Sequence, residues 1–152
     1  MQLAAYLGLI HRAEGELGQA FREIGDGHAE EPDVLHVCRT LAAQCEVHHE
    51  RLSPFPARYG EGAPDEPERL HSTLFSGVRS GGLGLLRDLQ DLYLMTCECD
   101  ITWTVVGQAA QALRDTDLLA VVTECQAETA VQGKWLKTRM KQAAPQALVV
   151  AS

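Results

Sequence analysis

The sequence has few of the features that mark several large classes of protein. Its 152 residues carry a formal net charge of -8 and no cluster of Lys or Arg, so neither nucleic acid nor an anionic membrane surface is an expected partner. No apolar run approaches the roughly 20 residues of a membrane-spanning helix. The N-terminus also lacks a basic segment followed by a continuous apolar stretch, the pattern of a secretory signal. We therefore expect a cytoplasmic protein.

Motifs for phosphate binding and for nucleophilic catalysis are lacking as well. The glycine-rich stretch at 81–84 follows no strand and contains no lysine, so it does not predict a phosphate loop. No serine or cysteine is placed with a base partner. The five cysteines are an odd number and fall inside expected helices, which favours reduced thiols packed as small core residues over disulfides.

Helical periodicity dominates what the sequence does contain. With 45% hydrophobic residues, the chain can form one domain over residues 1–152 with a real core. Apolar residues recur at helical spacing in four segments, which predict helices at about 2–25, 31–52, 83–114 and 118–144. Pro32 suits the first turn of the second helix, Asp115 can cap the fourth, and Pro145 is expected to end it.

The connections between these helices are short, long and short. The long connection, residues 53–82, holds four of the six prolines and is expected to contain a short helix at about 66–79. Residues 146–152 form a short tail. This order predicts an all-α fold, a ferritin-like four-helix bundle with a long crossover between its second and third helices.

An acidic residue interrupts the apolar stripe of the first helix. The stripe positions are Leu3, Leu7, Ile10, Glu14, Leu17, Phe21 and Ile24. Burial of an unpaired carboxylate costs on the order of several kcal/mol, so such a group is usually protonated, ion-paired, hydrogen-bonded or bound to a metal. The rest of the chain must therefore supply a partner for Glu14.

The second helix offers that partner in the motif Glu46-x-x-His49. Residues three apart share a helix face, and a carboxylate and an imidazole at this spacing can bind one metal ion. If the first turn is centred near Glu30, antiparallel packing places Glu14 and Glu46 at equal depth. His11, one turn from Glu14, and His48, on the apolar stripe of the second helix, are further candidates.

The third and fourth helices add one carboxylate each. Glu98 has Leu94, Ile101 and Val105 as same-face neighbours, which predicts a carboxylate among buried apolar residues. Glu128 lies in a similar apolar setting. A second turn centred near Asp115 makes Gln132 level with Glu98 and puts Glu128 about 6 Å away along the axis.

Together these residues resemble the ferritin-like superfamily and, distantly, its small bacterial stress-associated members. The resemblance implies a metal site formed by Glu14, Glu46, His49, Glu98 and Glu128. The family's second Glu-x-x-His motif is incomplete, because Val131 stands where the histidine would be, and Gln132 is an additional candidate ligand. Iron or manganese would be the metal, and oxygen or peroxide chemistry would follow if iron binds.

A metal-free interpretation stays open beside this one. The buried carboxylates could instead pair with Arg12, Arg39, Arg114 or histidines, or be held protonated. The chain would then be a dimerising or scaffold protein that uses the crossover or the apolar tail at 148–150 as a partner surface. The sequence leaves a homodimer or a higher homo-oligomer open in either case.

Overall fold

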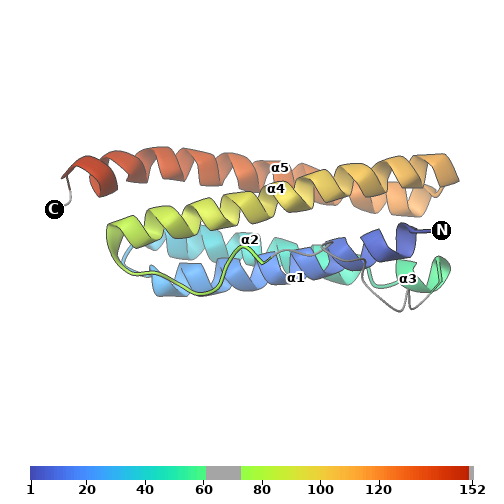
Figure 1. Ribbon diagram of the computed structural model, residues 1–152, viewed down its shortest axis with the longest axis horizontal. Helices are drawn as coiled ribbons and strands as arrows, with labels where there is room; N and C mark the ends of the chain where they lie inside the picture. The colour runs from blue at the N-terminus through green and yellow to red at the C-terminus, as the bar shows by residue number, and fades with distance from the viewer. Residues whose placement is uncertain (61–72, 151–152) are drawn as a thin grey trace.

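Four long helices make up most of the molecule. The computed structural model describes residues 1–60 and 73–150, and every regular element in these ranges is helical. The long helices lie side by side (Figure 1). They are α1 (Leu3–Gly27), α2 (Pro32–Arg51), α4 (Gly81–Leu113) and α5 (Thr116–Pro145), accompanied by the short α3 (Phe55–Arg58) and η1 (Gln146–Val150). The predicted all-α class and four long helices are confirmed.

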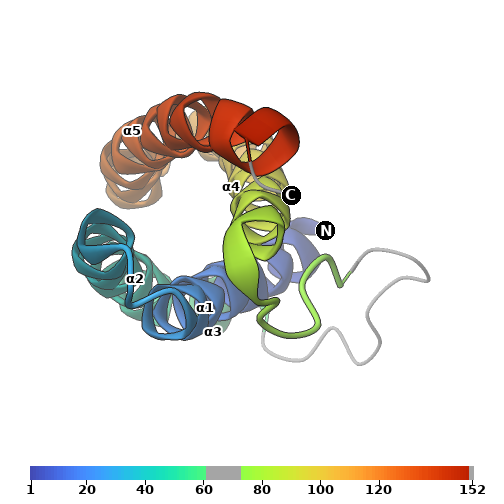
Figure 2. The same cartoon turned by 90° about the vertical axis from the view of Figure 1, so that its left-hand side faces the viewer.

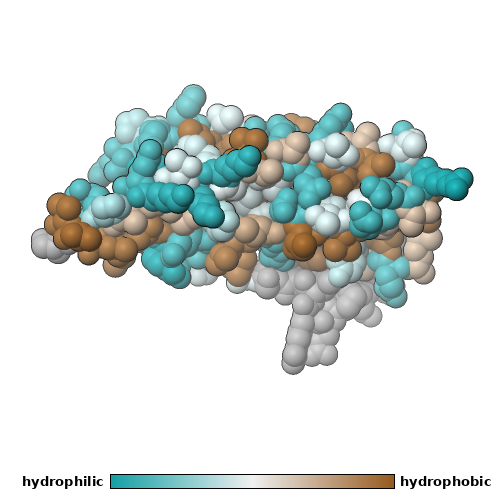
Figure 3. Space-filling view, turned by 90° about the horizontal axis from the view of Figure 1, so that it is seen from above, coloured by the Kyte–Doolittle hydropathy of each residue, from teal (hydrophilic) through white to brown (hydrophobic). Residues whose placement is uncertain are grey.

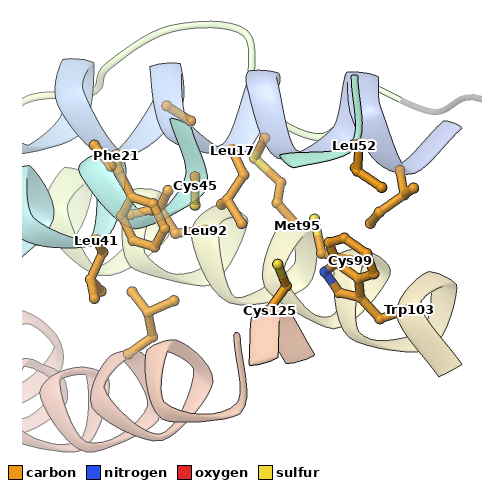
Figure 4. Close-up of a cluster of buried hydrophobic side chains, with 14 of the residues drawn as sticks. Leu17, Phe21, Leu41, Cys45, Leu52, Leu92, Met95, Cys99, Trp103 and Cys125 are labelled. Atoms are coloured by element: carbon orange, nitrogen blue, oxygen red, sulfur yellow. The ribbon is translucent and has the colours of Figure 1, made fainter. Parts of the chain in front are cut away.

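The helices bury the apolar stripes that the sequence shows. All seven stripe positions of α1 are buried, including Glu14. The core brings together Leu17 and Phe21 of α1, Leu41 of α2, Leu92 of α4 and Cys125 of α5 (Figure 4). Removal of this apolar surface from water is the main stabilising contribution to the bundle.

Neighbouring helices run antiparallel, and their order surrounds the core. α1 packs on both α2 and α4, and α4 packs on α5. Viewed along the bundle, the helices follow the order α2, α1, α4, α5 around the centre (Figure 2). At one end, His28 after α1 contacts Asp88 in the first turns of α4. α4 therefore begins where α1 ends, and the chain after α3 has to return along the bundle to reach it.

The described part of that return passes along α1. Residues 73–77 and residues of α1 line one shared cavity, and Val78 lies against Gly27. A Cβ on Gly27 would lie only 2.4 Å from Cγ1 of Val78, so any other residue here would require Val78 to shift. Arg79 then holds the segment by donating hydrogen bonds of 2.7 and 2.8 Å to Asp88 and Asp91.

The short helix expected in the crossover is not found where the structure describes that segment. Residues 73–80 form no helix, and the remainder of the expected range, up to residue 72, lies outside the described residues. Gly77 has a φ of 143°, a conformation that helical residues do not adopt. The one short helix described in this connection is α3, at its start.

The sequence predicted that Asp115 caps α5 and that Pro145 ends it, and the structure tests both expectations. Asp115 caps the helix as expected, because its Oδ1 accepts a hydrogen bond of 3.0 Å from the backbone N–H of Leu118. α5 ends at Pro145, but the helical path continues as the π-helical η1. Proline removes one backbone donor, and the chain passes into the wider turn instead of leaving the helix axis.

Candidate polar centre in the bundle core

Glu14 lies at the centre of the bundle and has a hydrogen-bond donor. Its side chain is fully buried, and its Oε1 accepts a hydrogen bond of 2.9 Å from the indole Nε1 of Trp103. Trp103 is also fully buried and comes from α4, across the core. One of the two carboxylate oxygens of Glu14 is thus satisfied by a neutral donor.

His48 of α2 lies between two carboxylates. Its Nε2 is 2.9 Å from Oε1 of Glu128, and its Nδ1 is 3.3 Å from Oε2 of Glu14. His48 is fully buried, whereas the side chain of Glu128 is 45% exposed. Burial alone would lower the pKa of His48, but the two carboxylates, Glu14 first and then Glu128, raise it above its ordinary value. The imidazole is therefore favoured in its charged form.

The contact between His48 and Glu14 differs from an ordinary hydrogen bond. Glu14 Oε2 and His48 Nδ1 are close enough for an ion pair, yet neither has a hydrogen-bond partner among the described residues. Buried polar atoms are normally hydrogen-bonded, because an unpaired one costs on the order of 1–3 kcal/mol. The charge attraction between an imidazolium and a carboxylate offsets part of this cost.

Two thiols and a side-chain amide lie around the network of Glu14, His48 and Glu128. Gln132 of α5 reaches across to α2, where its Nε2 lies 3.1 Å from Oε1 of Gln44 and 3.7 Å from Sγ of Cys45. Cys45 and Cys99 are fully buried. Burial, followed by the charge of Glu14, raises the pKa of both thiols well above the ordinary value. These cysteines are protonated at neutral pH and unsuited to nucleophilic chemistry.

Glu46, an expected ligand, lies away from this centre. Its carboxylate accepts two hydrogen bonds from Arg22 of α1, of 2.5 and 2.7 Å, at a site where both side chains are about half exposed. The hydrogen bonds from Arg22 lower the pKa of Glu46. Glu46 is therefore part of a surface ion pair between α1 and α2.

His49 is also placed elsewhere. Its ring stacks on that of His11, with centroids 3.6 Å apart and an interplanar angle of 20°. Nδ1 of His49 lies 2.7 Å from the backbone oxygen of His11, so this nitrogen must be the donor. Both histidines are half-buried. Burial and then the neighbouring His49 lower the pKa of His11.

Glu98 lies on an outward-facing stripe of α4. Its same-face neighbours Leu94, Ile101 and Val105 are 51%, 60% and 44% exposed, so the expectation that they form a buried setting is wrong. Glu98 itself is half-buried. Of the five expected ligands, the structure brings together only Glu14 and Glu128, and it does so through His48.

The packing of α2 on α1 explains why the Glu46-x-x-His49 motif misses the core. A Cβ on Gly18 would lie 3.2 Å from Cβ of Cys45, and one on Gly25 would lie 2.9 Å from Cβ of Cys38. Gly25 is two residues before the end of α1, whereas Cys38 is six residues after the start of α2. The facing residues of α1 and α2 are thus not at equal distances from the turn that joins the two helices. As a result, Glu46 lies beside Gly18 instead of level with Glu14.

The motif that faces the core is Cys45-x-x-His48, one residue earlier. Both residues belong to the apolar stripe of α2, which also contains Val34, Cys38, Leu41 and Leu52. The sequence already placed His48 on this stripe as a further candidate, and the structure shows it fully buried. Trp103 gave no such signal, because its spacing is that of an ordinary core residue.

The donor set does not fit the five-residue metal site that the ferritin-like resemblance implies. Such a centre needs several carboxylates and histidines converging from all four helices, but Glu46, His49 and Glu98 lie outside the core. Within residues 1–60 and 73–150, no group of three or more His, Cys, Asp or Glu side chains is arranged to hold a metal ion.

In the part of the chain that the structure describes, no helix combines the length and apolarity needed to cross a membrane.

No protein-family model, curated protein or solved structure matches the chain. Comparisons with known proteins therefore place no further constraint on this centre.

Proposed function

We propose that this chain is a ferritin-like helical bundle that acts as an interaction module, with an ion network in its core in place of the metal site that the resemblance implies. The observation that carries the metal-free core is the position of His48, whose two ring nitrogens face Glu14 and Glu128. A charged imidazole between two carboxylates supplies the partner that buried Glu14 requires.

The ferritin-like part of the proposal rests on the direction of the helices. α1 runs antiparallel to α2 and to α4, and residues 73–78, ahead of α4, lie along the bundle beside α1. A single long connection between the second and third long helices is characteristic of ferritin-like bundles. Because folds do not fix functions, this likeness supports the architecture and not a reaction.

One observation favours a second candidate function, the binding of a single iron or manganese ion in the core. Glu14 Oε2 and His48 Nδ1 face each other at 3.3 Å without hydrogen-bond partners. Two ligands of one ion, each about 2.1 Å from it, lie roughly this far apart. Oxygen and imidazole ligands suit Fe(II) and Mn(II), and a bound iron would supply redox chemistry. The protein's own contribution would be to hold and bury these two donors.

Metal loading separates the candidates. The protein is exposed to Fe(II) or Mn(II), passed through a desalting column and examined by elemental analysis. We expect the wild type to retain no stoichiometric metal, because His48 already compensates Glu14. Stoichiometric metal would contradict the proposal.

Four variants then identify any site that does bind. Metal lost in Glu14→Gln and His48→Gln, but retained in Glu46→Ala and His49→Ala, would establish a core site at the facing pair. Metal lost in all four would instead establish the ligand set expected from the resemblance. Glu46→Ala is a sound control, because its ion pair with Arg22 is about half exposed and contributes little to stability.

A further inference from the structure

We propose that two copies of this chain associate through an exposed stripe of α5, with the two α5 helices antiparallel. Residues at spacings of three and four share one helix face. The stripe, called the α5 stripe below, follows these spacings and includes the exposed residues Asp117, Glu124, Ala127, Val131, Lys134 and Lys141. The inference rests on the proposed function, because it names the partner and the surface of the interaction module.

The two halves of α5 carry charges of opposite sign. Residues 116–128 contain three acidic residues and no Lys or Arg, whereas residues 129–145 contain four basic residues and no Asp or Glu. Two such helices side by side bring like charges together when they are parallel and opposite charges together when they are antiparallel. The charge pattern of α5 therefore favours an antiparallel partner of the same sequence.

The helix dipole does not account for this pattern. Acidic residues near the start of a helix and basic residues near its end do stabilise it, but the effect falls off within the first and last turns. Glu124 is eight residues from the start of α5, and Lys134 is eleven residues from its end. These two residues lie too far inside the helix for the dipole to explain their signs.

The charges of the α5 stripe are symmetric about residue 129. Glu124 and Lys134 are each five positions from residue 129, and Asp117 and Lys141 are each twelve positions from it. A twofold axis beside residue 129 places every residue of the stripe opposite the one that lies equally far on the other side. Each acidic residue of the stripe then faces a lysine of the second copy, and both pairs occur twice in the dimer.

The middle of the α5 stripe is small and uncharged. Ala127 and Val131 lie two positions on either side of residue 129, and Val131 is 60% exposed. Ala120 and Thr138, nine positions from residue 129, are also exposed. Small side chains at these four positions let two helices approach closely, at a crossing angle of about 20°. The stripe from residue 117 to residue 141 is about 36 Å long, enough for several turns of helix contact.

The lysines of the α5 stripe have no partner of their own. Neither Lys134 nor Lys141 forms an ion pair with another residue in the described ranges 1–60 and 73–150. Glu124 contacts Arg51 at 2.6 Å, but its side chain is 63% exposed and can also accept from a lysine. Asp117 is 76% exposed and 3.5 Å from Arg58. The charges of the stripe are therefore available to a second copy.

Hydrophobic burial alone does not select a partner surface on this side of the molecule. The second half of α5 is uppermost in Figure 1, and Figure 3 views the molecule from above. Hydrophobic groups there occur in several separate areas among hydrophilic ones (Figure 3). The chain as a whole carries a net charge of -8, so two copies repel each other unless basic residues meet acidic ones. The antiparallel α5 stripe meets that condition.

The experiment reverses charges singly and then together. Mass is measured by sedimentation equilibrium over a range of protein concentrations. We expect the wild type to form dimers, and Lys134→Glu and Glu124→Lys each to weaken dimerisation by roughly tenfold or more, because like charges then face each other at two symmetric places. Raising the ionic strength should also weaken the wild-type dimer, because exposed charges are screened by salt.

The double variant Glu124→Lys with Lys134→Glu exchanges the two charges and should dimerise like the wild type. The two positions are ten residues apart on one helix, about 15 Å along its axis, so they make no contact within a chain. Recovery in the double variant therefore reports a contact between copies. Arg87→Glu is the control for net charge, because exposed Arg87 on α4 donates a hydrogen bond to Gln90 of the same helix. It should dimerise like the wild type.

Three results would overturn the inference. These are a monomeric wild type at every concentration, single variants that dimerise like the wild type, and a folded double variant that stays monomeric. Val149 in η1 is 81% exposed and belongs to the apolar tail. Dimers lost in Val149→Asp but kept in Lys134→Glu would place the contact at the tail instead. A monomeric wild type that binds a polyglutamate peptide, with binding lost in Lys134→Glu, would assign the basic half of α5 to a different acidic partner.

Folding and metal binding are followed separately. Circular dichroism and thermal unfolding of each variant show whether it retains the native helices. Metal content is measured on the same samples. A dimer that also retains stoichiometric metal would contradict the metal-free core and leave the α5 stripe established, whereas a metal-free monomer would contradict only the self-association.

Discussion

At the residue scale, the central feature is the imidazole of His48, which links the core to the surface. His48 contacts fully buried Glu14 on one side and partly exposed Glu128 on the other. Replacing only one member of a buried ion pair strands the other charge and costs on the order of 3–5 kcal/mol. Trp103 adds a neutral donor to the same carboxylate. The network therefore makes the core sensitive to small chemical changes at these side chains.

The first prediction at this scale concerns pH. The pKa of His48 is raised above its ordinary value of 6.5 by Glu14 and Glu128, against the opposing effect of burial. The stabilising contribution of charged His48 is therefore fully present below pH 6.5 and is lost as pH rises through the pKa of His48 in the folded protein. We expect the free energy of unfolding to fall as pH rises above 6.5, measured by urea denaturation.

His48→Gln is the control for this pH effect. The variant keeps a polar side chain of similar size but cannot carry the charge, so its stability should depend less on pH over the same range. A wild type whose stability rises with pH, or a variant with the same slope, would contradict the charged state inferred for His48.

At the element scale, Asp115 is the residue through which three elements meet. It caps α5 through Leu118 N–H, follows the left-handed Arg114 that ends α4, and accepts hydrogen bonds from Arg58 and Tyr59 at the end of α3. Burial would raise the pKa of Asp115, but the hydrogen bonds from Tyr59, Leu118 and Arg58 outweigh it and lower the pKa to about 2. One carboxylate thus fixes both a helix start and the beginning of the crossover.

A prediction about acid follows from this arrangement. Because the pKa of Asp115 is lowered, its stabilising contribution is present above the ordinary value of 3.8 and is lost as pH falls toward about 2. We expect Asp115→Ala to lower the free energy of unfolding at neutral pH by about 1–2 kcal/mol through loss of the cap. The difference from wild type should shrink in acid.

Asp117→Ala is the matched control. Asp117 lies in the same turn, but its side chain is 76% exposed and contacts Arg58 only at 3.5 Å. The variant should be close to wild type in urea denaturation. Equal losses in Asp115→Ala and Asp117→Ala would show that capping does not account for the effect.

At the scale of the whole molecule, the packing decides which thiols meet solvent. None of the five cysteines forms a disulfide, and four of them, Cys38, Cys45, Cys99 and Cys125, are buried while Cys97 is exposed. Burial raises the pKa of Cys38 and of Cys125 to about 12. The bundle therefore protects these thiols both by steric exclusion and by keeping them protonated.

Because four of the thiols are buried, a thiol-modification experiment should distinguish them from Cys97. In the native protein a water-soluble aromatic disulfide reagent should modify Cys97 rapidly and the buried cysteines far more slowly. All five should react in denaturant. Cys97→Ser should lose the rapid phase while keeping the slow one, and rapid reaction of several thiols in that variant would contradict the closed core.

Much of the fold followed from local patterns in the sequence. The stripes on α1 and α2 predicted the buried residues, Asp115 predicted a helix start, and the boundaries of the long helices agree with expectation within about two residues. These features depend on helical period and capping, which act over a few residues. The short helix expected at 66–79 lacked such a strong pattern, and the structure shows no helix over 73–80.

The candidate site was predicted less well, because it depends on which of several adjacent residues faces inward. Glu14 was identified from its own helix, since its apolar neighbours are buried with it. Glu46 and His49 were predicted to face the core, but the inward-facing residues of α2 are Cys45 and His48. This difference of one residue corresponds to about 100° of rotation around α2. Glu98 was misplaced because the apolar residues around it face outward.

The sequence by itself determined that this chain forms helices with a carboxylate in the core, because both properties follow from the spacing of apolar residues along each helix. The tertiary structure alone decided which side chain meets that carboxylate. Gly18 and Gly25 allow α2 to approach α1 at one register. That register turns His48 toward Glu14 and leaves Glu46 to Arg22, because helix contacts depend on close packing between segments distant in the sequence.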